Sequence, residues 1–296
     1  MLLSKTVPHL GRIYHPLGAG AQFDDLVDEI DEYFQHGITL EKGDVVFDVG
    51  ANIGAFALHA AKRAGGGLRF YCFEPIPEVH AALARNFETS PLLADSERHL
   101  FMVGLTALGA PDHAEFHYFK RLPCDTTQHI DEKREEFATF FAAKGDAAQS
   151  AMERALPGAL GRATGKSVGR LVSGLPRGTV SRWFFDRAIG VTKLRCPLET
   201  IADVVEREGV TRIDLLKVDV EGAELEVLQG VGEKVWPIVR QVVLEGHDKD
   251  GRLAAIEKLL RDHGFDDVHS EVPPLAVERA LNNFVLHARR TRNTAS

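Results

Sequence analysis

The 296-residue sequence lacks the marks of several protein classes. It has no run of about 18 apolar residues, so it predicts no membrane-spanning helix. Its first twenty residues do not combine a charged segment with a long apolar one, which argues against a secretory signal. Only three cysteines occur, Cys72, Cys124 and Cys196, and they are widely spaced. Because that pattern indicates neither a disulfide framework nor a zinc site, we expect a cytoplasmic protein.

Several catalytic and binding signatures are also missing. There is no G-x-S-x-G, H-E-x-x-H or Walker motif, so hydrolase and ATPase functions have no support. The net charge of −8 argues against a general nucleic-acid binder, and we expect no nucleic-acid partner. Hydrophobic residues make up 44% and charged residues 26%, as in an ordinary globular protein. No pattern indicates an oligomeric state.

Strand-like and helix-like segments alternate along most of the chain. This alternation predicts an α/β fold with a mostly parallel sheet and helices on both faces. We predict strands at 45–49, 68–73, 99–103, 115–119, 213–218, 239–245, 267–269 and 284–287, and helices at 53–63, 77–88, 198–208, 223–228 and 252–263.

One long segment interrupts the alternation. Residues 122–190 give no strand signal and include a helical patch at 131–143, so they are predicted to form a mostly helical insertion or lid over the active site. Within it, "DTTQH" at 125–129 offers hydroxyls and a histidine for a ligand contact, or forms a plain turn. The other predicted parts are an N-terminal helical lead-in (1–44), a core (45–121 and 191–290) and a disordered tail (291–296).

The stretch "DVVFDVGANIGAF", residues 44–56, ends a buried strand in a glycine-rich turn. Its G-x-x-x-G spacing differs from the G-x-G-x-x-G of dinucleotide sites. Asp48 would repel a pyrophosphate by roughly 1–4 kcal/mol but would attract a cation such as S-adenosylmethionine. We therefore predict that Asp48, Gly50, Asn52 and Gly54 bind that cofactor, although Asp48 could instead be a helix N-cap.

A second acid follows the next predicted strand. Glu74, in "YCFEP", lies 24 residues after Gly50. An acid at this position accepts ribose hydroxyls in nucleotide-binding folds. We predict that role for Glu74, with a surface-loop acid as the alternative.

Three motifs in fixed order, "DVVFDVGANIG", "FEPIPEVHAALARN" and "LKVDVEGAELEVLQG", resemble the FkbM family of S-adenosylmethionine-dependent methyltransferases. The resemblance covers residues 33–109 and 196–289. It implies a Rossmann-like class I methyltransferase fold whose seven-stranded sheet ends in an antiparallel strand, here "NNFVLHA". It also implies methylation, mostly at hydroxyl oxygen, of small-molecule acceptors such as polyketides, peptides and sugars in secondary metabolism.

Candidate catalytic residues follow two later strands. An alcohol acceptor benefits from a general base, and His247 is our candidate because its ordinary pKa near 6.5 suits neutral pH. Asp219 and Glu221 are candidates for contacting the cofactor or orienting the substrate. Alternatively, His247 makes a structural hydrogen bond and Glu221 interacts with a helix dipole. These three residues could bind a divalent metal, but their spacing shows no dedicated cage and we expect none.

Other readings remain open at this stage. The acceptor could be a sugar hydroxyl of a glycan or lipid. An NAD-type oxidoreductase is disfavoured by the missing glycine and by Asp48. The chain could also be a non-catalytic binding protein that keeps the cofactor pocket. Lys217 lies inside a predicted strand, which is unusual for a lysine; it is either an edge or cavity residue or the partner of an acid such as Glu245.

Overall fold

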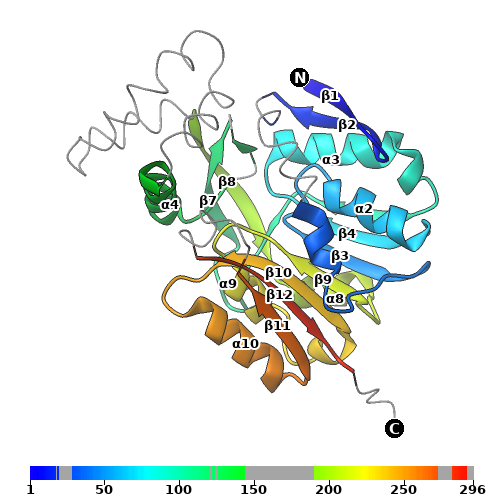
Figure 1. Cartoon of the computed structure of the whole chain (residues 1–296), viewed down its shortest axis with the longest axis vertical. Helices are drawn as coiled ribbons and strands as arrows, with labels where there is room; N and C mark the ends of the chain where they lie inside the picture. The colour runs from blue at the N-terminus through cyan, green and yellow to red at the C-terminus, as the bar shows by residue number, and fades with distance from the viewer. Residues whose placement is uncertain are drawn as a thin grey trace.

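A seven-stranded sheet forms the centre of the molecule (Figure 1). The computed structural model describes residues 1–17, 19, 29–120, 122–123, 126–143, 190–272 and 282–291. The strand order is β11 (Asp267–Glu271), β12 (Asn283–Arg289), β10 (Gln241–His247), β9 (Leu215–Val218), β3 (Val45–Val49), β4 (Arg69–Phe73) and β5 (Glu97–Phe101). In this sheet of the described chain, β12 runs antiparallel to both of its neighbours, and the other neighbouring strands are parallel. This confirms the predicted Rossmann-like class I fold.

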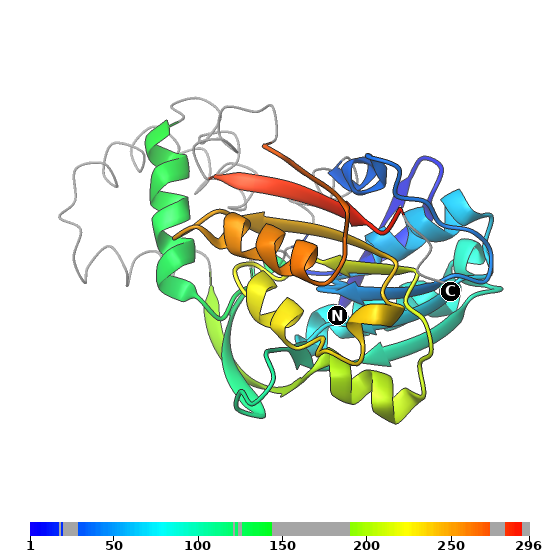
Figure 2. The same ribbon diagram turned by 90° about the horizontal axis from the view of Figure 1, so that it is seen from below.

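Helices cover both faces of the sheet (Figures 1 and 2). One face carries α2 (Ala55–Ala64), α3 (Pro77–Thr89) and the 3-10 helix η2 (Glu29–Phe34), and the other carries α8 (Ile201–Glu208), α9 (Glu224–Gln229) and α10 (Arg252–Asp262). Val46 of β3 packs with the first layer, whereas Val45, Phe47 and Val49 pack with the second. Burial on both faces explains why β3 reads as a hydrophobic run.

The N-terminal segment differs from the predicted helical lead-in at 1–44. β1 (Leu2–Val7) and β2 (Gly11–Pro16) form an antiparallel hairpin, and among the described residues of 1–44 the helix is η2. Asn86 of α3 fixes the hairpin, because its side chain bonds the backbone N–H and carbonyl of Tyr14 at 2.7 and 2.9 Å. This contact joins residues far apart in the sequence and satisfies backbone groups of β2. The local sequence pattern of 1–44 therefore does not reveal the hairpin.

In a second small sheet the strand predicted at 115–119 is present as β7 (His113–Phe119), but β6 (Gly104–Leu105) and β8 (Val191–Glu199) were missed. β8 pairs antiparallel with β7 and parallel with β6. The predicted helix from 198 therefore starts later, at Ile201, where the Thr200 hydroxyl caps α8 by accepting from the Asp203 N–H. In β8 the charged Lys193 and Arg195 alternate with Leu194 and Cys196, which is the period of a half-buried strand.

Part of the predicted insertion is a helix. α4 (Ile130–Ala143) matches the helical patch predicted at 131–143, while 144–189 and the tail at 292–296 lie outside the described residues. The remaining short elements are the 3-10 helices η3 (Pro91–Leu93) and η5 (Trp236–Ile238). Across the part of the chain that the structure describes, no helix combines the length and apolar character needed to cross a membrane.

The turn after β3 leads to a prediction about Gly50. A Cβ atom at Gly50 (φ 74°) would lie 1.7 Å from the Asp219 carbonyl oxygen, whereas one at Gly65 (also φ 74°) would meet nothing within 4 Å. Gly65→Ala carries only the left-handed backbone strain, about 1–2 kcal/mol. Gly50→Ala adds the collision, so we expect a loss of about 3–5 kcal/mol in urea unfolding. Equal losses in the two variants would contradict this account.

Candidate active site

A cavity opens where the strand order reverses between β3 and β9. In sheets of this kind ligands bind beyond the carboxyl ends of the strands at such a point. The polar and charged lining residues come from the ends of β3, β4, β9 and β10, from η2 and from the segment before α4: Tyr33, Asn52, Glu74, Thr126, Gln128, Lys217, Asp219, Glu221 and Glu245. Predicted residues Gly50, Asn52, Glu74, Asp219 and Glu221 therefore meet in one cavity, as does part of "DTTQH".

The glycine turn brings main chain to the cavity wall. Gly50 and Ala51 donate N–H bonds to the Phe73 carbonyl at 3.1 and 3.0 Å, which ties the ends of β3 and β4 together. Asn52 lines the cavity, and its buried Oδ1 has no hydrogen-bond partner among the described residues. Gly54 is not in the lining; it is the N-cap of α2 at φ 84°.

Glu74 lies at the wall beyond β4 and is only 7% exposed. Burial raises the pKa of its carboxyl to about 7, against backbone hydrogen bonds from Ile76 and Asn52 that favour the charged form. The Ile76 N–H donates to Oε1 at 2.8 Å. A carboxyl so placed can exchange hydrogen bonds with ligand hydroxyls.

Asp48 is absent from the described cavity lining, which argues against the predicted ligand contact; that contact stays a prediction. The Asp48 side chain is 0% exposed, and Lys217 Nζ lies 3.3 Å from its Oδ1. Burial lowers the pKa of Lys217, but the charges of Asp48 and Asp219 outweigh burial and raise it. Asp48 is thus neutralised internally and cannot supply the attraction for a cation that the sequence suggested.

Lys217 also contacts the cavity rim. It donates to the Gly50 carbonyl at 2.9 Å and pairs with Asp219 Oδ2 at 3.4 Å. Two of the alternatives left open by the sequence hold together, because Lys217 lines the cavity and pairs with acids. The acids within ion-pair distance are Asp48 and Asp219, not Glu245.

Tyr33 joins two acids at the ends of β9 and β10. Its hydroxyl donates to Glu245 Oε2 and lies 3.3 Å from Asp219 Oδ2. Burial and the nearby Asp219 charge raise the pKa of Glu245 to about 8, although the Tyr33 hydrogen bond opposes the rise. Sequence reasoning gave Glu245 no role at the site and missed Tyr33, which is 212 residues away along the chain.

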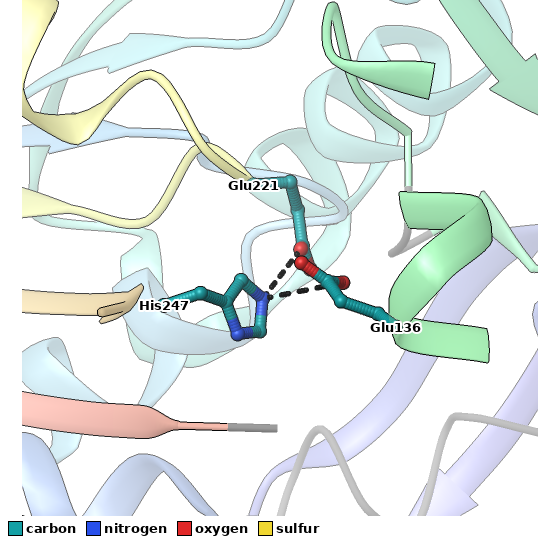
Figure 3. Close-up of side chains that lie close together, drawn as sticks. All are labelled: Glu136, Glu221 and His247. Atoms are coloured by element: carbon teal, nitrogen blue, oxygen red, sulfur yellow. Dashed lines mark hydrogen bonds and ion pairs between the residues drawn. The ribbon is translucent and has the colours of Figure 1, made fainter. Parts of the chain in front are cut away.

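Glu221 and His247 belong to a separate network with α4 (Figure 3). Lys133 Nζ lies 2.6 Å from Glu221 Oε2 and 2.9 Å from Glu136 Oε2, and His247 Nε2 lies 3.4 Å from Glu221 Oε2. The Thr127 hydroxyl donates to the Glu221 carbonyl at 2.7 Å. Both the backbone and the side chain of Glu221 are therefore held by the segment that includes α4.

Protonation in this network changes the role predicted for His247. Burial lowers the pKa of His247, but its hydrogen bond to Glu221 and the Glu221 charge raise it to about 9. Burial raises the pKa of Glu221, but Lys133 and His247 outweigh burial and lower it to about 2. His247 is also absent from the cavity lining, and its Nδ1 lies 2.7 Å from Asn283 Oδ1. A cationic histidine does not accept a proton, so these surroundings argue against His247 as the base near neutral pH, and its role as base stays a prediction.

Ligand atoms of Glu136, Glu221 and His247 all lie within 4.8 Å of one another, close enough to hold a metal ion. The Lys133 ammonium, however, already bonds to both carboxylates. A divalent ion would have to displace this lysine and the proton of His247.

A Rossmann-like sheet with a cavity at its switch point is typical of proteins that bind a nucleotide-containing cofactor. The family profile described as "Methyltransferase FkbM domain" matches residues 48–266. The chain is 34% identical over 248 residues to 31-O-demethyl-FK506 methyltransferase FkbM of Streptomyces tacrolimicus, covering 82% of this chain and 81% of that protein. It is 32% identical over 229 residues to methyltransferase sdnD of Sordaria araneosa, covering 75% and 73%.

A crystal structure of methyltransferase FkbM from Methylobacillus flagellatus KT is also similar, with a TM-score of 0.46 and 12% identity over 86% of this chain and 46% of that one. The family match and the identity to the Streptomyces tacrolimicus relative show that this chain belongs to the FkbM methyltransferase family. It is therefore a methyltransferase, and the resemblance seen in the sequence is confirmed.

The buried lysine leads to a stability prediction. Lys217→Met leaves the buried Asp48 carboxyl without its cation, so that it must stay charged in the interior or take up a proton, and we expect a loss of about 3–5 kcal/mol in urea unfolding. Adding Asp48→Asn should recover part of the loss. Lys193→Met is the matched control, because Lys193 is 65% exposed and pairs with Glu115 at the surface. That control should lose less than about 1 kcal/mol. A loss in Lys217→Met no larger than in the control would refute the account.

The network around His247 leads to a prediction about titration. In nuclear magnetic resonance titrations, wild-type His247 should titrate near pH 9. In Glu221→Gln it should titrate below about pH 7, because burial then acts without the Glu221 charge. Because the folded pKa lies above the ordinary value near 6.5, this interaction stabilises the fold fully below about pH 6.5. The contribution is lost as the pH rises through about 9. Glu132→Gln removes an α4 carboxylate bonded to Arg252 and should leave the pKa of His247 unchanged. An unchanged pKa of His247 in Glu221→Gln would contradict the assignment.

Proposed function

We propose that the protein transfers a methyl group from S-adenosylmethionine to a hydroxyl oxygen of a small molecule, as a step in secondary metabolism. The observation that carries this proposal is the cavity at the β3–β9 switch point, with Glu74 and Asn52 at one end and Asp219 and Glu245 at the other. The cofactor supplies an electrophilic methyl group on a positively charged sulfur. The acceptor must supply a nucleophile held in line with it.

The residues of the cavity fit this cofactor. The unpartnered Oδ1 of Asn52 and the buried carboxyl of Glu74 are polar groups suited to a nucleoside. Gly50 lines the cavity and has no side chain, so a ligand can approach its backbone closely. Asp219 and Glu221 outnumber Lys217 along the lining, and such an excess of acids attracts a cation. We infer that these two acids, rather than Asp48, attract the cation.

The name of a relative supports a hydroxyl acceptor. The name of the Streptomyces tacrolimicus relative describes methylation of an oxygen of FK506. In this chain α4 contacts the cavity residue Glu221 through Lys133, which supports a role for part of 122–190 near the bound acceptor. We infer that this segment contributes to the choice of acceptor.

Calorimetry tests the cofactor. S-Adenosylmethionine should bind and NAD should not. Glu74→Gln should weaken binding of S-adenosylmethionine about tenfold or more, because it removes a charged hydrogen-bonding group. Glu88→Gln is the control. Glu88 belongs to α3, the helix that follows β4 and Glu74, but it is exposed and bonds Arg85. Binding of NAD alone, or equal affinity in Glu74→Gln and wild type, would overturn the proposed cofactor site.

Mass spectrometry tests the reaction. Host extract is incubated with the protein and methyl-labelled cofactor, and labelled products are identified. We expect one labelled small molecule carrying a methyl ether. A labelled amine, a labelled ester or a labelled macromolecule would overturn the hydroxyl assignment.

A further inference from the structure

We propose that Glu245 is the general base that takes the proton from the acceptor hydroxyl, and that Tyr33 is a positioning residue that holds its carboxylate. This inference rests on the proposed function and assigns a catalytic residue to it. It also replaces His247 in the role that the sequence suggested.

The position of Glu245 supports this role. It lies near the carboxyl end of β10 and lines the cavity with Asp219, which follows the neighbouring strand β9. Glu74, the candidate nucleoside contact, follows β4 on the other side of β3. The cavity thus runs across the ends of the strands, and Glu245 lies away from Glu74, which leaves it free to face the acceptor in the proposed reaction.

The other carboxylates of the described lining are less suited to accept a proton. Glu221 bonds to the Lys133 ammonium at 2.6 Å, and the pKa of its carboxyl is lowered to about 2 by Lys133 and His247 against burial. Asp219 forms an ion pair with Lys217 at 3.4 Å. Glu74 lies at the nucleoside end and already accepts the Ile76 N–H.

The surroundings of Glu245 give it a base strength matched to neutral or mildly alkaline pH. Burial, Asp219 and Glu221 raise the pKa of this carboxyl to about 8, and the Tyr33 hydrogen bond and Lys217 limit the rise. A general base is most effective when its pKa lies near the working pH. An ordinary glutamate, with a pKa near 4.3, would be a much weaker base for a hydroxyl proton.

The proton and electron pairs balance in this step. Glu245 takes the hydroxyl proton while the acceptor oxygen uses its electron pair to bond the methyl carbon. The pair of the broken carbon–sulfur bond stays on sulfur, which becomes a neutral thioether. Glu245 then loses its proton to water as the methyl ether leaves. Tyr33 keeps one carboxylate oxygen fixed throughout, because its hydroxyl donates to Oε2.

The first test needs no acceptor. Infrared difference spectra across a pH titration should show a carboxyl that ionises near pH 8 in wild type and is missing in Glu245→Gln. Glu224→Gln is the matched control, because Glu224 is a fully buried carboxyl with its pKa raised to about 7 that does not line the cavity. Tyr33→Phe should move the Glu245 ionisation to higher pH, since the lost hydrogen bond favours the charged form. A signal near pH 8 that persists in Glu245→Gln would overturn the inference.

Binding separates a base from a cofactor ligand. Glu245→Gln should bind S-adenosylmethionine within about twofold of wild type, because a group reserved for the acceptor contributes less than about 0.4 kcal/mol to cofactor binding. A loss as large as in Glu74→Gln would make Glu245 a cofactor ligand and overturn its role as base. Absence of binding in the wild type itself would instead overturn the proposed function.

The second test uses the acceptor identified by labelling. Wild-type kcat should rise with pH through about 8, the pKa of Glu245. Glu245→Gln should lower kcat about 10²–10⁴-fold and remove this rise, with little change in KM for the cofactor. Tyr33→Phe should shift the rise to higher pH. Glu233→Gln, at a residue 90% exposed, should keep the wild-type profile. Methyl transfer by Glu245→Gln with an unchanged pH profile would overturn the inference while leaving the proposed function intact.

Discussion

The cation of Lys217 is the interaction on which the rest of the site depends. Lys217 and Asp48 are register partners on the adjacent strands β9 and β3, and their side chains form a buried ion pair at 3.3 Å. The same ammonium donates to the Gly50 carbonyl and lies 5.9 and 5.8 Å from the ring centroids of Tyr33 and Phe56. One buried cation therefore links two strand ends, the glycine turn and the aromatic residues above it.

Acids on one rim are given opposite properties by their neighbours. Glu221 faces the cations Lys133 and His247, which hold the pKa of its carboxyl down. Glu245 faces burial and the anions Asp219 and Glu221, which hold the pKa of its carboxyl up. Environments that push the proton affinities of neighbouring groups apart are what separate acid, base and purely electrostatic roles in an active site. Here the separation depends on α4, an element outside the central sheet, because its Lys133 bonds to Glu221.

Sequence patterns were sufficient for the central sheet and its helices. β3 and β9 are short hydrophobic runs, because both faces of a parallel sheet are buried, and the glycines at 50 and 54 mark the turn that follows β3. The β1–β2 hairpin and β8 were not recognised, because their stability comes from partners such as Asn86 and β7 that are distant along the chain. Local propensity is a weak guide where such tertiary contacts decide the structure.

By itself, the sequence determined the family, the α/β fold and the carboxyl ends of the strands as the place where Asn52, Glu74, Asp219 and Glu221 meet. Only the tertiary structure decided which acids face the cavity and which carry a proton. Asp48 pairs with Lys217 in the interior, the pKa of His247 is raised beside Glu221, and Glu245 accepts a hydrogen bond from Tyr33. The reason is physical: strand ends are fixed by local hydrophobic patterns, whereas charge depends on burial and on neighbours within a few ångströms that the order of residues does not reveal.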